Sequence, residues 1–191
     1  MKITLVRHGK PKASVNPKVS AVGFANWVRA YNRSLVISSS KPSEELCKRI
    51  NGSYTVSSDL NRARHSTELC AGKSPDLILR ELREMDIPRL KLPFFISVDH
   101  WLILSRICWF LGISGKSESF KVGRQRIISA VDLLVEQTYK NSHITVFGHG
   151  LTNRFVAKEL KRRGWRIQQK SKGFWGTIEL VNITIRTNKP E

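Results

Sequence analysis

The 191-residue sequence has few acidic residues: 15 Asp and Glu stand against 33 Lys and Arg, which gives a formal net charge of +18. Such a charge attracts anions, which include phosphorylated metabolites, nucleic acids and acidic membrane surfaces, but it does not determine the fold. The densest cluster of cations lies between Lys158 and Lys172. It fits a solvated helix face with the turn after it, and it contains no recognisable nucleic-acid-binding motif. The sequence therefore does not favour nucleic acid as the partner.

Cysteine is also scarce, and the three cysteines at positions 47, 70 and 108 form neither a C-x-x-C pair nor a zinc-type pattern with histidine. An odd number excludes a complete disulfide framework and fits small buried side chains in a reducing compartment. The most apolar stretch, residues 92–113, contains Asp99, His100 and Arg106, which argues against a membrane span. The N-terminus leads directly into a strand without a secretory signal pattern, so we expect a cytoplasmic protein.

Strands and helices are predicted to alternate, which is typical of an α/β protein, and the length fits one domain over residues 1–191. Four strands are expected, at residues 3–6, 54–58, 76–82 and 143–147. Helices are expected at residues 19–32, from 43, from 59 to 71, over most of 93–112, from 117 to 139 and at 151–163. The tail from Gly173 to Ile185 reads as one or two edge strands separated near Asn182, and residues 88–116 as a helical cap or insert.

The first predicted strand ends at Arg7-His8-Gly9. In open α/β sheets, ligands bind at the carboxyl ends of the strands. A neutral imidazole can attack phosphorus, and a guanidinium matches the geometry of phosphate oxygens, so this tripeptide fits a phosphate site with His8 as nucleophile and Arg7 as anion ligand. A surface arginine beside a partly buried histidine is the alternative interpretation.

Three further predicted strands also end in polar residues. Arg62 follows the second strand, at the start of a helix whose free N–H groups suit phosphate. Glu84 and Asp86 follow the third strand, and a carboxyl group there could protonate a leaving oxygen or simply pair with an arginine. His149 follows the fourth strand between two glycines, which repeats the pattern at His8.

Four motifs, in this order, resemble those of the histidine phosphatase superfamily, which has the phosphoglycerate-mutase-like fold. They are Leu5-Val6-Arg7-His8-Gly9, Ser58-Asp59-Leu60-Asn61-Arg62-Ala63, Leu82-Arg83-Glu84 and Phe147-Gly148-His149-Gly150, and Glu118-Ser119 with Arg126 also resembles a family segment. The resemblance covers residues 3 to about 160. It implies a three-layer α/β/α sandwich with a mostly parallel central sheet.

The resemblance also implies a metal-independent phosphatase without a cofactor. His8 would take the phosphoryl group from a monoester, and water would later cleave the phosphohistidine. Arg7, Arg62 and His149 would bind the phosphoryl oxygens, His149 most strongly if it is protonated. Glu84 would act as general acid and then as base. The substrate would be a phosphorylated small molecule or a phosphoprotein.

Two local departures from the family pattern leave alternatives open. Lys10 stands where many members have a glutamate, and Met85-Asp86-Ile87-Pro88 replaces a glycine-containing run, so Asp86 is a second candidate for the general acid. The chain is also shorter than cofactor-dependent mutases, which favours a phosphatase over a phosphoglycerate-mutase-type phosphotransferase. A non-enzymatic binder of anions or nucleic acid is the third alternative, but it would not need a nucleophile.

Overall fold

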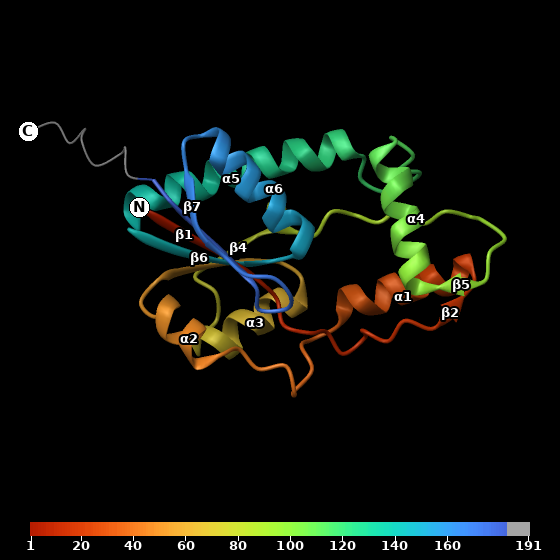
Figure 1. Ribbon diagram of the computed structural model, residues 1–191, viewed down its shortest axis with the longest axis horizontal. Helices are drawn as coiled ribbons and strands as arrows, with labels where there is room; N and C mark the ends of the chain where they lie inside the picture. The colour runs from red at the N-terminus through yellow and green to blue at the C-terminus, as the bar shows by residue number, and fades with distance from the viewer. Residues whose placement is uncertain (183–191) are drawn as a thin grey trace, which may run out of the picture.

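A six-stranded sheet forms the centre of the computed structural model, which describes residues 1–182 (Figure 1). The strands lie in the order β4-β3-β6-β1-β8-β7. Their bounds are β1 (Lys2–Arg7), β3 (Tyr54–Ser58), β4 (Leu77–Leu79), β6 (His143–Gly148), β7 (Arg166–Lys170) and β8 (Thr177–Val181). β1 and β3 both pair in parallel with β6, and β4 pairs in parallel with β3, whereas β8 is antiparallel to β1 and to β7. The sheet is therefore mostly parallel, as predicted.

Helices cover both faces of this sheet, because alternate side chains of the strands are apolar on each side. Ile3 and Leu5 of β1 belong to the larger core cluster, which includes residues of α5 (Phe120–Lys140) and α6 (Gly150–Arg162). Val6 lies in a second cluster with residues of α2 (Glu44–Ile50) and α3 (Asn61–Ala71). Figure 1 shows the two pairs of helices on opposite sides of the strands. The predicted three-layer α/β/α sandwich is confirmed.

The two remaining helices, α1 (Ala21–Arg33) and α4 (Val98–Phe110), pack against each other beyond the carboxyl ends of the strands (Figure 1). Phe24 and Val28 of α1 and Trp101 of α4 are buried in a third apolar cluster. A short antiparallel pair, β2 (Lys18–Val19) with β5 (Ile96–Ser97), joins the two segments that precede these helices in the sequence. We call α1, α4, β2 and β5 the cap. Residues 88–116 thus pack against an N-terminal helix, while their description as an insert stays a prediction.

The structure corrects the third predicted strand. The strand expected over residues 76–82 is only Leu77–Leu79, and Arg80–Leu82 form a 3-10 turn. The carboxylate of Asp76 accepts hydrogen bonds from the backbone N–H and hydroxyl of Thr55 before the strand begins. After the strand, the carbonyl oxygen of Glu81 accepts from Arg126 rather than from a neighbouring strand. Side chains therefore set both limits of the strand.

The structure also corrects the C-terminal strands. β8 is not an edge strand, because it lies between β1 and β7. The edge is β7, in a segment that the sequence analysis assigned to solvated surface after a helix. All five residues of β7 are exposed, so it has no apolar alternation to identify it. The second strand expected beyond Asn182 lies outside the described residues. Among residues 1–182, no helix is both long and apolar enough to cross a membrane.

The packing predicts different effects for two Leu→Ala substitutions. Leu134 of α5 is fully buried in the larger core cluster, whereas Leu111 is 73% exposed. We expect Leu134→Ala to lower the free energy of unfolding by about 2–5 kcal/mol, because it leaves a cavity in the core. Leu111→Ala should change it by less than about 0.5 kcal/mol. Urea denaturation measures both values, and equal effects would contradict the described packing.

Candidate active site

Three neighbouring parallel strands, β1, β6 and β3, have their carboxyl ends side by side, and each is followed by polar residues. β6 lies between β1 and β3, with Arg7 opposite Gly148 and Phe147 opposite Ser57. His8 follows β1 directly and His149 follows β6, while Arg62 lies in the first turn of α3, shortly after β3. The ring centroids of the two histidines are 5.1 Å apart. The structure thus brings together three site residues that lie up to 141 positions apart in the chain.

His8 is held as one tautomer by hydrogen bonds at both ring nitrogens. Nδ1 lies 2.8 Å from the carbonyl oxygen of Gly9, which can only accept, so Nδ1 carries the hydrogen. Nε2 accepts a hydrogen bond from Nε of Arg62 at 3.2 Å. Burial lowers the pKa of His8 to about 3, and the positive charges of Arg62 and Arg7 add to this effect although the bond to Gly9 opposes it. His8 is therefore neutral near pH 7, with the lone pair on Nε2.

Arg62 is a buried cation, with 1% of its surface exposed. Besides His8, its Nη1 donates to the carbonyl oxygen of Tyr31 at 3.1 Å, and its guanidinium lies 4.7 Å from the centre of the Tyr31 ring. Ser66, one turn further along α3, donates to the carbonyl oxygen of Arg62 and accepts from the backbone N–H of Gly9. This hydroxyl therefore fixes α3 to the segment that carries His8.

His149 is fully buried, and one of its nitrogens has no hydrogen-bond partner. Nε2 lies 2.9 Å from the hydroxyl of Ser58, whereas Nδ1 has no partner among the described residues. Complete burial, together with the nearby charge of Arg62, holds the pKa of His149 well below the ordinary histidine value. The protonated form that would bind a phosphoryl group most strongly is therefore not the resting form, and the positive charge of the site comes from arginine.

Arg7 lies beside the two histidines. Its guanidinium stacks on the ring of Phe174 at 4.4 Å, and its buried Nε has no partner among the described residues. A Cβ added to Gly150 would lie 3.4 Å from this Nε, so the absence of a side chain at Gly150 leaves room for Arg7. Arg7 Nε and His149 Nδ1 are thus two buried nitrogens without acceptors in the part of the chain that the structure describes, and such groups indicate a missing hydrogen-bond partner.

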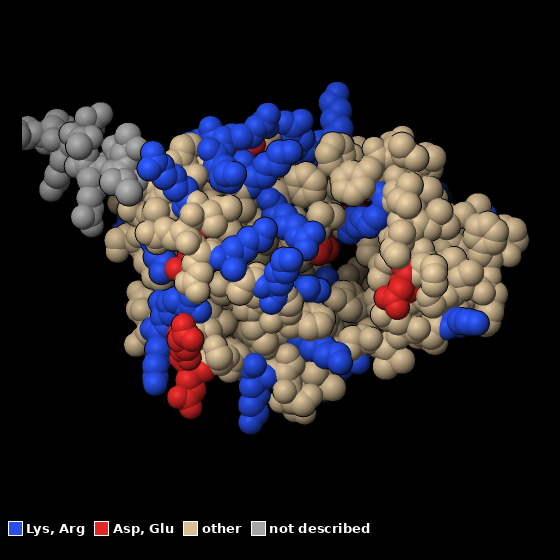
Figure 2. All heavy atoms as spheres, in the orientation of Figure 1, with Lys and Arg blue, Asp and Glu red and all other residues tan. Residues whose placement is uncertain are grey.

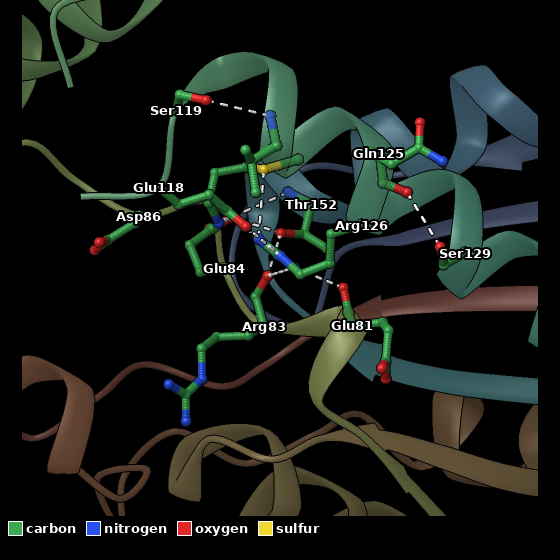
Figure 3. A network of polar contacts seen from close by, with 12 residues as sticks. Glu81, Arg83, Glu84, Asp86, Glu118, Ser119, Gln125, Arg126, Ser129 and Thr152 are labelled. Carbon is green, nitrogen blue, oxygen red and sulfur yellow. Dashed lines mark hydrogen bonds and ion pairs between the residues drawn. The ribbon is translucent and has the colours of Figure 1, made fainter. Parts of the chain in front are cut away.

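Glu84 lies at the N-terminus of α6, the helix that His149 precedes. One carboxylate oxygen accepts from the backbone N–H and the hydroxyl of Thr152, both at 3.0 Å, and the other accepts from the N–H of Leu151 at 3.4 Å. Asp86 instead accepts from the N–H of Ile87, and its side chain points away from Glu84 in Figure 3. The structure thus places Glu84, rather than Asp86, next to the segment that contains His149.

Two arginines hold the segment around Glu84 in position, and Figure 3 shows one of them, Arg126. Arg126 forms a two-pronged ion pair with Glu118, at 2.6 and 2.7 Å, and donates to the carbonyl oxygens of Glu81 and Arg83. Arg106 of α4 donates to the carbonyl oxygens of Met85 and Asp86. Residues 81–86 pair with no strand among residues 1–182, so these side chains take the place of the hydrogen bonds of a sheet. The Glu118 and Arg126 pair of the sequence analysis therefore has a positioning function.

A cavity of about 800 Å³ lies between these strand ends and the cap. Figure 2 shows the hollow between the cap and the rest of the molecule. Arginine is the main charged residue of its lining, with seven arginines against three acids. The arginines are Arg29, Arg62, Arg80, Arg83, Arg89, Arg106 and Arg126, and the acids are Glu84, Asp86 and Glu118. The cavity can therefore accept a ligand with substantial negative charge.

Sequence reasoning missed two aromatic residues of this site. Tyr31 stacks on Trp27 within a predicted helix, and Phe174 lies in the tail segment that was predicted as strand. No local pattern distinguishes a ring under a guanidinium from a ring in the core. In the loop after His8, Lys12 lines a different cavity and Asn16 donates to Asp99 in the cap. Within residues 1–182, no group of three His, Cys, Asp or Glu side chains could hold a metal ion.

Comparison with known proteins identifies similar folds. A family model described as "Histidine phosphatase superfamily (branch 1)" matches residues 37–191, a region that excludes β1 and His8. No curated protein matches the sequence. The structure resembles an open reading frame product of Mycobacterium tuberculosis, with 17% identity, coverage of 83% of this chain and 78% of that one, and a TM-score of 0.58.

Two phosphatase structures are also similar. The α-ribazole phosphatase of Shigella flexneri is 19% identical, with coverage of 93% and 94% and a TM-score of 0.56. A mutant phosphoserine phosphatase of Entamoeba histolytica in complex with phosphoserine is 14% identical, with coverage of 93% and 89% and a TM-score of 0.57. At these identities, the likeness establishes the fold alone.

The lowered pKa of His8 predicts a loss of stability in acid. The unfolded chain binds a proton near pH 6.5, and the folded chain binds it only near pH 3, so stability falls as the pH drops between these values. From pH 7 to pH 5 this should cost about 2 kcal/mol, at about 1.4 kcal/mol for each pKa unit. Urea denaturation at both pH values measures it. His8→Gln should remove this part of the loss, and His100→Gln, at an exposed position, should not.

Proposed function

The chain belongs to the histidine phosphatase superfamily, and we propose that it hydrolyses phosphate monoesters through a phosphohistidine formed on Nε2 of His8. The observation that carries the proposal is the state of His8. Its imidazole is neutral, Nδ1 holds the hydrogen, and Nε2 directs its lone pair toward a buried cation. A nucleophile for phosphorus needs this free lone pair, and a phosphoryl group needs a cation beside it.

In the first step, Nε2 forms a bond to phosphorus as the bond from phosphorus to the leaving oxygen breaks. The N–H of Arg62 that now binds Nε2 turns to a phosphoryl oxygen, because Nε2 no longer has a free lone pair. Beside the histidine pair, the buried Nε of Arg7 and Nδ1 of His149 have no partner among the described residues. These groups together bind the equatorial oxygens, on which the charge of the transition state is spread.

His149 gains a proton when substrate binds. A phosphate dianion beside the ring favours the charged imidazolium and raises its pKa. The hydroxyl of Ser58 is within hydrogen-bond distance of Nε2 and already accepts from the N–H of Leu60. In the neutral ring, the hydroxyl can therefore donate to Nε2, which leaves the hydrogen on Nδ1. In the protonated ring, the hydroxyl accepts from Nε2 instead, and Nδ1 remains the donor to the phosphoryl group. Deep burial keeps His149 neutral until this anion arrives.

Glu84 is the proposed general acid. In its protonated form it gives a proton to the leaving oxygen, and as a carboxylate it later takes a proton from the water that attacks phosphorus. The bond between Nε2 and phosphorus then breaks, and inorganic phosphate leaves. Glu84 lines the cavity and binds Thr152, two residues after Gly150, so it lies near the phosphoryl site. Asp86 also lines the cavity but points away from this position.

The proposed substrate is a phosphorylated small molecule or the phosphorylated side chain of a protein. The cavity of about 800 Å³ and its arginines fit an anionic leaving group of metabolite size. α-Ribazole phosphatase and phosphoserine phosphatase share this fold, which supports water as the acceptor of the phosphoryl group over a second sugar phosphate.

Removal of the nucleophile gives the first test. Wild-type protein should hydrolyse p-nitrophenyl phosphate in EDTA, and His8→Ala should lower kcat/KM by about three orders of magnitude or more. Acid-quenched wild type, but not the variant, should contain an acid-labile phosphoryl group from labelled substrate. His100→Ala, on the surface of the cap, is the matched control and should keep full activity. Wild-type protein that turns over no monoester, or a variant that stays active, would contradict the proposal.

The leaving group separates the two candidate acids. A general acid contributes most when the leaving alcohol is a poor one, by about 10² to 10⁴-fold. We therefore expect Glu84→Gln to lower kcat/KM, which reports the first step, by about 10²-fold for a simple alkyl phosphate and by less than about tenfold for p-nitrophenyl phosphate. Asp86→Asn should affect both substrates equally and weakly. The reverse pattern would assign the acid to Asp86.

A further inference from the structure

Large apolar side chains are exposed along the outer side of the cap. Seven of them, 46% to 73% exposed, lie within residues 94–113. They are Phe94, Phe95, Ile103, Ile107, Phe110, Leu111 and Ile113, and we call them the α4 face. Single exposed apolar residues are normal on protein surfaces, but a contiguous group indicates a surface that binds something.

The α4 face results from a helix that is apolar on both sides. Trp101, Ser105 and Trp109 are buried, and they recur at four-residue spacing on the inner side. Ile103 and Ile107 recur at the same spacing on the outer side. A helix that is apolar all round is usually enclosed by protein or lipid. α4 has 13 residues, about 20 Å in length, which is too short for a bilayer core of about 30 Å.

Most exposed charged residues in the sequence segment that contains the α4 face are positive. Within residues 88–124, five exposed residues are cationic and one exposed residue is acidic. The cations are Arg89, Lys91, Lys116, Lys121 and Arg124, and the acid is Asp99. In the view of Figure 2, most of the surface around α4 is uncharged, with one acidic and one basic group near its lower end, whereas lysine and arginine cover much of the rest of the molecule. An apolar surface with cations at both ends of its segment complements the acyl chains and phosphate groups of anionic lipid.

We propose that the α4 face docks on the surface of an anionic lipid bilayer. The apolar side chains enter the boundary between headgroups and acyl chains, and the five cations contact lipid phosphates. The net charge of +18 attracts the chain to such a surface over a longer range. Leu102 and Arg106, on the inner side of α4, line the catalytic cavity, so docking places this cavity next to the membrane. The proposal does not depend on which phosphate ester is hydrolysed.

Sedimentation with vesicles tests the proposal. Wild-type protein should bind phosphatidylcholine vesicles that contain phosphatidylglycerol. Binding should weaken when salt is added, and it should be weaker with vesicles of phosphatidylcholine alone. Ile107→Ser with Phe110→Ser should weaken the partition coefficient about 100-fold, which is about tenfold for each large side chain. Tyr139→Ser is the matched control. Tyr139 is 65% exposed at the C-terminal end of α5, whereas α4 precedes the N-terminal end of α5, so this substitution should leave binding unchanged.

Three results would overturn the proposal. The first is no sedimentation with anionic vesicles. The second is binding that the double variant retains in full, which would assign the attraction to charge elsewhere on the surface. The third is a wild-type dimer in analytical ultracentrifugation, without vesicles, that the double variant converts to a monomer, since a second copy of the chain would then cover the α4 face. Hydrolysis of p-nitrophenyl phosphate by the double variant shows in each case that the catalytic site is intact.

Discussion

The contact between Arg62 and His8 determines the chemistry of the site. Arg62 is a buried cation, and among the described residues its partners are a neutral imidazole, a backbone carbonyl, a side-chain amide and an aromatic ring. A charge that is removed from water without a carboxylate partner favours the binding of an anion. Burial lowers the pKa of His8, and the same cation adds to this effect, so the imidazole stays neutral. One guanidinium thus contributes both to the neutral state of the nucleophile and to the affinity for phosphate.

The arginines around the cavity form two groups with different functions. Arg106 and Arg126 use their N–H groups on backbone carbonyls and on Glu118, and they hold residues 81–86 where no strand could. Arg7 keeps a buried N–H without a partner among the described residues, and Arg62 has neutral partners that an anion can replace. The first group positions Glu84, and the second group is available to a ligand. Composition shows only that cations are abundant.

Much of the fold was predictable because its strands are buried and its site residues follow them directly. His8, Arg62 and His149 could be placed together because parallel strands end at one edge of the sheet. β7 could not be predicted, since its residues are exposed and its pairing depends on β8. The roles of Tyr31 and Phe174 were also hidden, because their contacts with Arg62 and Arg7 join distant segments. Whether Glu84 or Asp86 faces the site depends on α6, which begins more than 60 residues later.

The position of β6 has a consequence for the order in which the site is assembled. β1 and β3 lie early in the chain, yet they do not pair, because β6 occupies the place between them. During synthesis they must wait for residues 143–148, and no alternative strand in the described chain joins them. Closing such distant pairings is slow because the entropy of a long loop is lost first. The phosphate site is thus expected to form late in folding. A nascent chain that lacks β6 has neither a continuous sheet nor His149.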